Sequence, residues 1–158
     1  MAAATARPEH LLASTKLAPL PATPTSAIDV LLSIFEAQGR IASLVGVESR
    51  TFGLTPSEAL ALIALTRAVL PVSGIARAVG IRPNGASVLV DRLRERRLVR
   101  RQRSRRDNRV VTVELSDEGR DLTAALIEKV NAKLGGALAP LSPGEVAQLF
   151  SSLARIAV

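Results

Sequence analysis

The chain has 158 residues and a formal net charge of +7, with 47% hydrophobic but only 2% aromatic residues. This length fits one domain, and the apolar residues, mainly Ala, Leu, Val and Ile, favour packed helices. The absence of cysteine excludes disulfides, thiolate metal sites and thiol redox sensing. No apolar run approaches the roughly 20 residues of a membrane span, and no secretory signal pattern is found. We therefore expect a cytoplasmic protein.

The positive charge is concentrated in one segment. Residues 82–109 contain eleven arginines and three carboxylates, a net charge of +8, so the other 130 residues together carry −1. Six of the arginines lie in the ten residues RRQRSRRDNR at 100–109. A loop that only keeps the protein in solution would not require such localisation. The pattern indicates an anionic partner, with nucleic acid favoured over an anionic membrane.

The N-terminal half begins with a segment that we do not expect to be helical. Residues 1–24 are rich in Ala, Pro, Thr and Ser, and the repeated prolines predict a mobile arm. A first helix is predicted from Ser26 to about Ser49, because Ser26 and Asp29 form a capping-box-like pair before apolar residues at helical spacing. A second helix is predicted after the N-cap Thr55, with Pro56 at its first position.

The middle of the chain changes from helical to strand periodicity. A short helix is predicted over PVSGIARAV and ends at Gly80, and another runs from Pro83 to Arg96. From Leu98 the runs LVRRQR and RVVTVEL favour strands, and they are separated by the polar SRRDN. These runs predict a β-hairpin whose tip and one arm carry the arginine cluster.

Two helices are predicted at the C-terminal end. Ser116 caps a long helix that the pair Gly135-Gly136 is expected to kink or end. The last helix begins at the N-cap Ser142 with Pro143 and Glu145. Its apolar stripe is predicted to be buried and consists of Val146, Leu149, Phe150, Leu153 and Ile156.

Three short helices followed by a hairpin predict a mainly α fold with a small β-hairpin, the winged helix-turn-helix, at about 54–116. Dimerisation helices are expected to flank it at about 26–49 and 117–158. A helix roughly 10–12 Å across fits the major groove, which is about 12 Å wide. The hairpin, called the wing, can then reach the DNA backbone or minor groove. We therefore interpret residues 83–96 as a recognition helix.

The N-terminal half of the recognition helix is expected to approach base edges through Arg82, Asn84 and Ser87. Gly85 and Ala86 are expected to allow close backbone approach, and the first-turn amides suit a phosphate. The predicted DNA-binding residues of the helix are Arg82, Pro83, Asn84, Gly85, Ala86, Ser87, Arg92 and Arg94. Those of the wing are Arg101, Arg103, Arg105, Arg106, Asp107, Asn108 and Arg109.

The run GIRPNGASVLVDRLRERRLVRRQRSRRDNRVVTVELSDEGRDL resembles the MarR family of bacterial winged helix-turn-helix transcriptional regulators. The resemblance is carried by four short segments in the expected order and spacing. They are Val90-Asp91-Arg92-Leu93, Leu98-Val99-Arg100, Asp107-Asn108-Arg109, and Leu115-Ser116-Asp117-Glu118-Gly119. The resemblance implies that residues 25–158 form one MarR-like domain.

The resemblance implies roles for individual residues. Arg109 would enter the minor groove, while Asp107 would hold the wing by pairing with Arg103 or Arg105. Asp91 and Arg92 would have structural and phosphate-contacting roles. The first helix and the last two would interlock in an obligate homodimer that binds a pseudo-palindromic operator in double-stranded DNA. The predicted dimerisation residues are Leu31, Phe35, Leu134, Leu138, Leu149, Phe150 and Leu153.

Two departures from the family pattern bear on function. Members often carry Thr and Arg where this chain has Gly85 and Val88, so base recognition is expected to shift to Arg82, Asn84 and Ser87. Arg97 stands where a glycine is usual before Leu-Val. If the backbone there is left-handed, a non-glycine residue costs roughly 1–2 kcal/mol.

We expect a regulator without enzymatic activity, cofactor or metal, and we favour a repressor released by a small-molecule effector. The resemblance places that ligand between the DNA-binding lobe and the dimerisation helices, near Phe35, Phe52 and Leu54. An activator, or a member without a ligand, is also compatible with the sequence. The alternative from another class is a basic module that binds RNA or an anionic membrane. RNA modules usually offer aromatic platforms, and no Phe, Tyr or Trp lies within residues 82–109.

Overall fold

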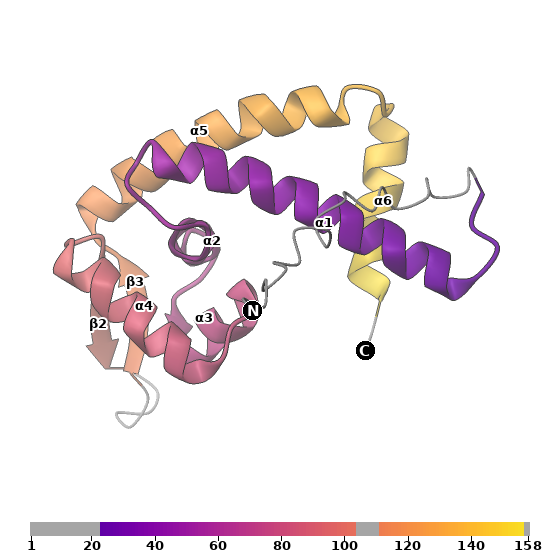
Figure 1. Cartoon of the computed structure of the whole chain (residues 1–158). Helices are drawn as coiled ribbons and strands as arrows, with labels where there is room; N and C mark the ends of the chain where they lie inside the picture. Colours follow the sequence, from indigo (N-terminus) through magenta and orange to yellow (C-terminus); the bar gives the residue numbers. More distant parts are fainter. Residues whose placement is uncertain (1–22, 104–110, 157–158) are drawn as a thin grey trace, which may run out of the picture. The chain divides into compact units, whose positions relative to one another are not determined.

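The computed structural model describes residues 23–103 and 111–156 (Figure 1). These residues form two units, 23–38 and 39–156, which are described separately. The predicted N-terminal arm, apart from Thr23 and Pro24, and the predicted wing tip at 104–110 lie outside the described residues.

Helix α1 (Ala27–Arg50) begins as the sequence predicted, and the boundary between the two units falls within it. Asp29 accepts hydrogen bonds from the backbone amides of Thr25 and Ser26 and from the Thr25 hydroxyl. These bonds favour the ionised carboxylate and lower the pKa of Asp29, the Thr25 hydroxyl contributing most. In the second unit, α1 buries Val45 and Ser49.

Helix α1 is also long and apolar enough to cross a membrane, with a mean hydropathy of 1.4 over a window that is 11% buried. The expectation that no apolar segment approaches this length was therefore wrong. It counted uninterrupted apolar runs, whereas scattered polar residues in α1 leave the average hydropathy high. This criterion uses length and composition alone, and an amphipathic helix covered by a protein surface also meets it.

Three short helices and a small sheet follow. Helices α2 (Pro56–Leu65), α3 (Val72–Val79) and α4 (Pro83–Glu95) lie beside the strands in Figure 1. Thr55 and Glu58 form the predicted capping box, with the Thr55 amide donating to Glu58 at 2.8 Å. Gly80 ends α3 in a left-handed conformation with φ 72°, which a residue lacking Cβ adopts without strain.

The sheet has three antiparallel strands in the order β1-β3-β2, namely Leu70–Pro71, Val111–Leu115 and Val99–Arg103. In the hairpin, Val99 pairs with Leu115 and Arg103 with Val111, which confirms the predicted strand pair. Strand β1 was not predicted. It has only two residues, and its pairing of Leu70 with Val113 depends on contacts distant in sequence.

Helix α5 (Asp117–Leu138) starts at its predicted cap, where the Ser116 hydroxyl accepts from the Gly119 amide at 2.9 Å. Gly119 is needed there because an added Cβ would lie 1.9 Å from the carbonyl oxygen of Leu98. The helix continues through Gly135 and Gly136 to Leu138, so of the two expected effects of this pair, a kink or an end, the end is wrong. Glycine weakens a helix interior by only about 1 kcal/mol, which does not by itself end a long helix.

Helix α6 (Pro143–Arg155) has the predicted capping box of Ser142 and Glu145. Hydrogen bonds from the Ser142 hydroxyl and amide lower the pKa of Glu145. The α6 stripe is mostly exposed in the single chain, and its burial in a dimer interface stays a prediction. Val146 is half-buried, whereas Leu149, Phe150, Leu153 and Ile156 are exposed. Among the described residues of the second unit, no other element buries this stripe.

The core lies in the second unit and joins the short helices, the sheet and the first half of α5. Its largest fully buried apolar side chains come from α2, α3, α4, β3 and α5, and are Leu62, Ile75, Leu93, Leu126, Val90 and Val113. This closed core fixes the positions of α4 and the hairpin relative to each other.

Candidate nucleic-acid interface

Helix α4 packs one face on the core and leaves the other accessible. Its buried residues are Ala86, Leu89, Val90 and Leu93, which recur at helical spacing. Arg82 is the N-cap, and its guanidinium, which has donors only, cannot accept hydrogen bonds from the amides of the first turn. The start of the helix therefore combines a cation with backbone donors, an arrangement suited to a phosphate.

The structure separates the predicted recognition-helix residues into exposed and inward-facing groups. Ala86 is fully buried, so its assignment as a DNA-binding residue was wrong. Helical periodicity places it with Leu89 and Leu93 on the core side. Ser87 is half-buried, and its hydroxyl donates to the Pro83 carbonyl at 3.3 Å. The exposed predicted residues are Arg82, Pro83, Asn84, Gly85, Arg92 and Arg94.

Asp91 connects the recognition helix to the wing. Its carboxylate lies 3.1 Å from the Arg101 guanidinium of β2 and 3.7 Å from that of Arg94. Arg101, predicted as a wing residue that binds DNA, is therefore paired with α4. No partner of Asp91 could be identified from the sequence, because strand and helix are brought together only by the tertiary fold.

The base of the wing has its own polar cluster. Glu114 on β3 accepts hydrogen bonds from Arg100 and Gln102 on the neighbouring strand β2. Cross-strand pairs of this kind stabilise hairpin register. The backbone of Arg103 ends β2, while Arg105, Arg106, Asp107, Asn108 and Arg109 lie outside the described residues. The predicted pairing of Asp107 lies outside them as well.

Arg96 and Arg97 follow the last turn of α4. The contact of Arg96 was not predicted from the sequence, and the backbone conformation of Arg97 was only suggested by it. Arg96 donates to the carbonyl oxygens of Gly53 at 2.7 Å and Phe52 at 3.1 Å, and so ties α4 to the turn between α1 and α2. No local sequence signal identifies this contact, which spans more than forty residues. Arg97 has φ 58°, so the left-handed conformation inferred from the usual glycine is present.

A hollow of about 470 Å³ lies between the first turn of α2 and α4. Gly85, Val88 and Arg92 line its α4 side, and Thr55 and Glu58 line its α2 side. Glu58 is committed to the capping box, so the hollow offers few unused polar groups. It lies beside the exposed face of the recognition helix, where Val88 and Arg92 line it.

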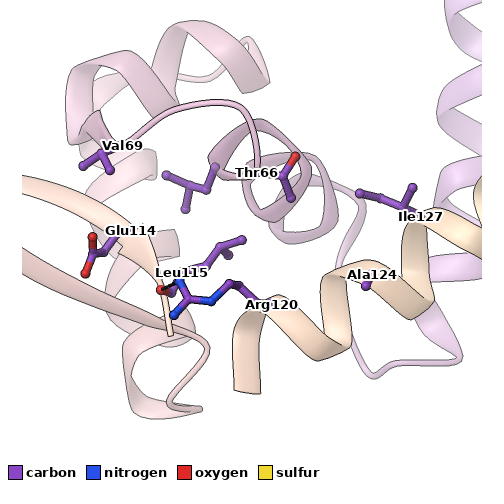
Figure 2. A pocket seen from close by; sticks show the side chains of 8 residues that line it. Thr66, Val69, Glu114, Leu115, Arg120, Ala124 and Ile127 are labelled. Carbon is purple, nitrogen blue, oxygen red and sulfur yellow. Dashed lines mark hydrogen bonds between the residues drawn. The ribbon is translucent and has the colours of Figure 1, made fainter. Parts of the chain in front are cut away.

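A second hollow, of about 370 Å³, lies between the end of α2, strand β3 and the first half of α5. Figure 2 shows Leu115, Ala124 and Ile127 around it, with Glu114 and Arg120 at its polar edge. Arg120 donates to the Leu115 carbonyl at 3.1 Å and pairs with Asp117. The expected ligand-site residue Leu54 is instead part of the closed core.

No metal centre accompanies these features in the part of the chain that the structure describes. Residues 23–103 and 111–156 contain no group of three or more His, Cys, Asp or Glu side chains able to hold an ion. The arrangement instead presents an accessible helix beside a basic two-stranded wing, which is suited to binding a duplex.

The fold is that of a winged helix-turn-helix protein. The model of the MarR family matches residues 52–109. The HTH-type transcriptional repressor MdtR of Bacillus subtilis is 34% identical over 68 residues, a match covering 42% of this chain and 44% of MdtR. The chain thus matches less than half the length of that relative.

Two solved structures cover more of the chain. A probable transcriptional regulator from Pseudomonas aeruginosa is 30% identical with a TM-score of 0.64, over 80% of this chain and 95% of that one. CouR from Rhodococcus jostii RHA1, solved bound to p-coumaroyl-CoA, is 25% identical with a TM-score of 0.71, over 84% and 93%. The chain belongs to the MarR family.

Proposed function

We propose that the chain is a cytoplasmic, homodimeric transcriptional regulator that binds a pseudo-palindromic DNA operator and has no enzymatic activity. The observation that carries this proposal is that α4 has one buried face and one accessible face beside the wing. The buried face is anchored in the core, and the same core holds the basic wing beside the accessible face, where Arg101 pairs with Asp91. Family membership supports the same role.

We assign the DNA contacts to residues of α4 and to one arginine of the wing. Arg82 at the start of α4 and Arg92 within it are exposed and are proposed to bind phosphates. Asn84 is proposed to read a base edge, and Arg109 is proposed to enter the minor groove. Domain boundaries at about 25–158, with the DNA-binding lobe at about 54–116, are part of this proposal.

Dimerisation is proposed from exposed apolar helices. In the first unit, Leu31 and Phe35 are exposed; in the second, Phe150 is 69% exposed, the largest value among the large hydrophobic side chains that the structure describes. Within each helix the exposed apolar side chains recur at helical spacing, and an exposed apolar stripe of this kind usually marks an interface. The proposed interface residues of the second unit are Leu138, Leu149, Phe150 and Leu153, with half-buried Leu134 at its edge.

Release by a small molecule is proposed to use the hollow shown in Figure 2. Leu65, Leu115 and Ile127 supply an apolar wall and Arg120 supplies a cation, which together suit an apolar molecule with an anionic group. Because α5 contributes to this hollow and then extends to the proposed dimer interface, a bound ligand would affect both. Repression is the favoured outcome, since the relative MdtR is named a repressor.

The experiment is nuclease footprinting of the full chain on a duplex that spans its own upstream region, together with fluorescence anisotropy at several salt concentrations. We expect protection of an inverted repeat whose half-sites lie about one helical turn apart. Affinity should fall with salt at a log–log slope of about −0.9 for each phosphate neutralised. Equal competition by single-stranded RNA or by anionic liposomes would overturn the proposal and favour a basic module without duplex readout.

A further inference from the structure

The outward face of α4 can be derived from its buried residues. Successive residues of an α-helix are rotated by about 100°. With Ala86, Leu89, Val90 and Leu93 facing the core, the opposite side presents Asn84, Val88, Asp91 and Glu95. The first two are exposed, and Val88 retains 53% of its accessible surface.

The two halves of this outward face differ in charge. Asp91 and Glu95 occupy the C-terminal half, where carboxylates would face the phosphates of a bound duplex. Asp91 is partly neutralised by Arg101 and Arg94. The N-terminal half carries the neutral side chains of Asn84 and Val88. It is therefore the half suited to lie deepest in the groove, and Val88 lies on its exposed surface.

Val88 is the large hydrophobic side chain that α4 exposes. A β-branched side chain in a helix has essentially one χ1 rotamer, so the two methyl groups are held in a fixed direction. The apolar group that duplex DNA presents in the major groove is the 5-methyl of thymine. Ser87, the neighbouring residue that the sequence favoured for base readout, is half-buried and donates its hydroxyl to Pro83.

We propose that Val88 is a specificity-determining residue that contacts the 5-methyl group of a thymine in each operator half-site. This inference rests on the proposed function and adds to it one base of the recognised sequence. Val88 is one helical turn from Asn84, an axial separation of about 6 Å. Since base pairs stack about 3.4 Å apart, the thymine lies about two steps from the base that Asn84 reads. The amide of Asn84 is suited to adenine.

The test begins with the full chain and a random duplex library, from which bound sequences are selected to define a consensus. Each thymine of the consensus is then replaced by deoxyuridine, which removes only the 5-methyl group, and dissociation constants are measured by anisotropy. We expect one thymine per half-site whose replacement weakens binding about four-fold, the effect of uncovering one methyl group. The other thymines should be much less sensitive.

Variants then assign that sensitivity to the side chain. Val88→Ala should bind thymine and deoxyuridine at the sensitive position equally well, whereas Val88→Thr, which keeps one methyl group, should retain part of the difference. Leu60→Ala is the control, because Leu60 is also an exposed aliphatic residue but lies on α2 and lines neither hollow. It should preserve the full four-fold effect.

The outcomes distinguish this inference from the function on which it rests. If selection yields no consensus, sequence-specific regulation fails. If a consensus appears but no thymine is sensitive to loss of its methyl group, the proposed regulatory function is retained and the assignment of Val88 is overturned. Methyl sensitivity that persists in Val88→Ala also overturns it, and would leave Val88 as a wall of the hollow between α2 and α4.

Discussion

The Arg101 guanidinium lies 3.1 Å from a carboxylate oxygen of Asp91 and joins the first wing strand to the outward face of α4. The Arg101 and Asp91 side chains are 33% and 42% exposed. A pair so accessible to water stabilises the fold by less than about 1 kcal/mol. Its main consequence is electrostatic, because it reduces the negative charge that Asp91 would otherwise present to a duplex.

Asp91→Asn should therefore increase binding to DNA of unrelated sequence while changing the free energy of unfolding by less than about 1 kcal/mol. The substitution removes a carboxylate and releases Arg101 to bind a phosphate. Anisotropy with a scrambled duplex should give a log–log salt slope steeper by about 0.9 if one more phosphate is neutralised. Asp121→Asn, the same charge change on α5, is the control. A weaker affinity for scrambled DNA in Asp91→Asn would contradict the electrostatic explanation.

Arg96→Met should destabilise the fold without changing the salt dependence of DNA binding. The variant loses two hydrogen bonds to the carbonyls of Phe52 and Gly53, which together contribute about 1 kcal/mol at an exposed position. Urea unfolding measures the first effect and the salt slope measures the second. Arg94→Met is the comparison, since Arg94 is exposed and was predicted from the sequence to bind DNA, so its loss should lower the slope. A reduced slope in Arg96→Met would show that Arg96 itself binds a phosphate.

Arg97→Gly should stabilise the protein by about 1 kcal/mol, because glycine adopts a positive φ without the strain of a Cβ. The wild-type residue has φ 58°. Arg97→Ala keeps the Cβ and removes the charge, so its free energy of unfolding in urea should remain close to the wild-type value. Equal stabilisation by glycine and alanine would attribute the effect to charge repulsion among the arginines.

Gly119→Ala should destabilise the protein by several kcal/mol, on the order of 3 or more, because overpacking here forces backbone to move. The new Cβ would lie 1.9 Å from the Leu98 carbonyl oxygen and 2.8 Å from its carbonyl carbon. Gly135→Ala in the same helix meets no atom within 4 Å and should be neutral or stabilising. Thermal unfolding of both variants, measured at one protein concentration, separates the contact from helix propensity. Similar melting temperatures would refute the close packing at Gly119.

Phe150→Ser should weaken self-association at least ten-fold while leaving the DNA-binding lobe folded. Phe150 is 69% exposed in the single chain, so the substitution removes no contact that the described core requires. Sedimentation velocity across a dilution series measures the dissociation constant, and circular dichroism measures helix content. Leu60→Ser, on the exposed side of α2 in the lobe, is the control. An unchanged dimer in Phe150→Ser would exclude this part of α6 from the interface.

The helices were predictable because their local signals agree with their packing. Thr55 and Ser142 each stand three residues before a glutamate, and both capping boxes form. Strand β1 and the contact of Arg96 with Phe52 were not predictable, because both join segments far apart in the sequence. Ala86 was misassigned because its small size suggested close approach to DNA, while its place in the helical repeat decides that it faces the core.

The close packing of Gly119 on the Leu98 carbonyl couples the start of α5 mechanically to the residues that follow the recognition helix. The Ser116 hydroxyl also donates to the Arg97 carbonyl, so the first turn of α5 is attached at two points to the junction of recognition helix and wing. From that attachment, α5 runs for 22 residues, roughly 33 Å at the rise of an α-helix. A tilt imposed at the far end of α5 would therefore move the recognition helix and the wing as one rigid body. In the proposed homodimer, the distance between the two recognition helices would change with it.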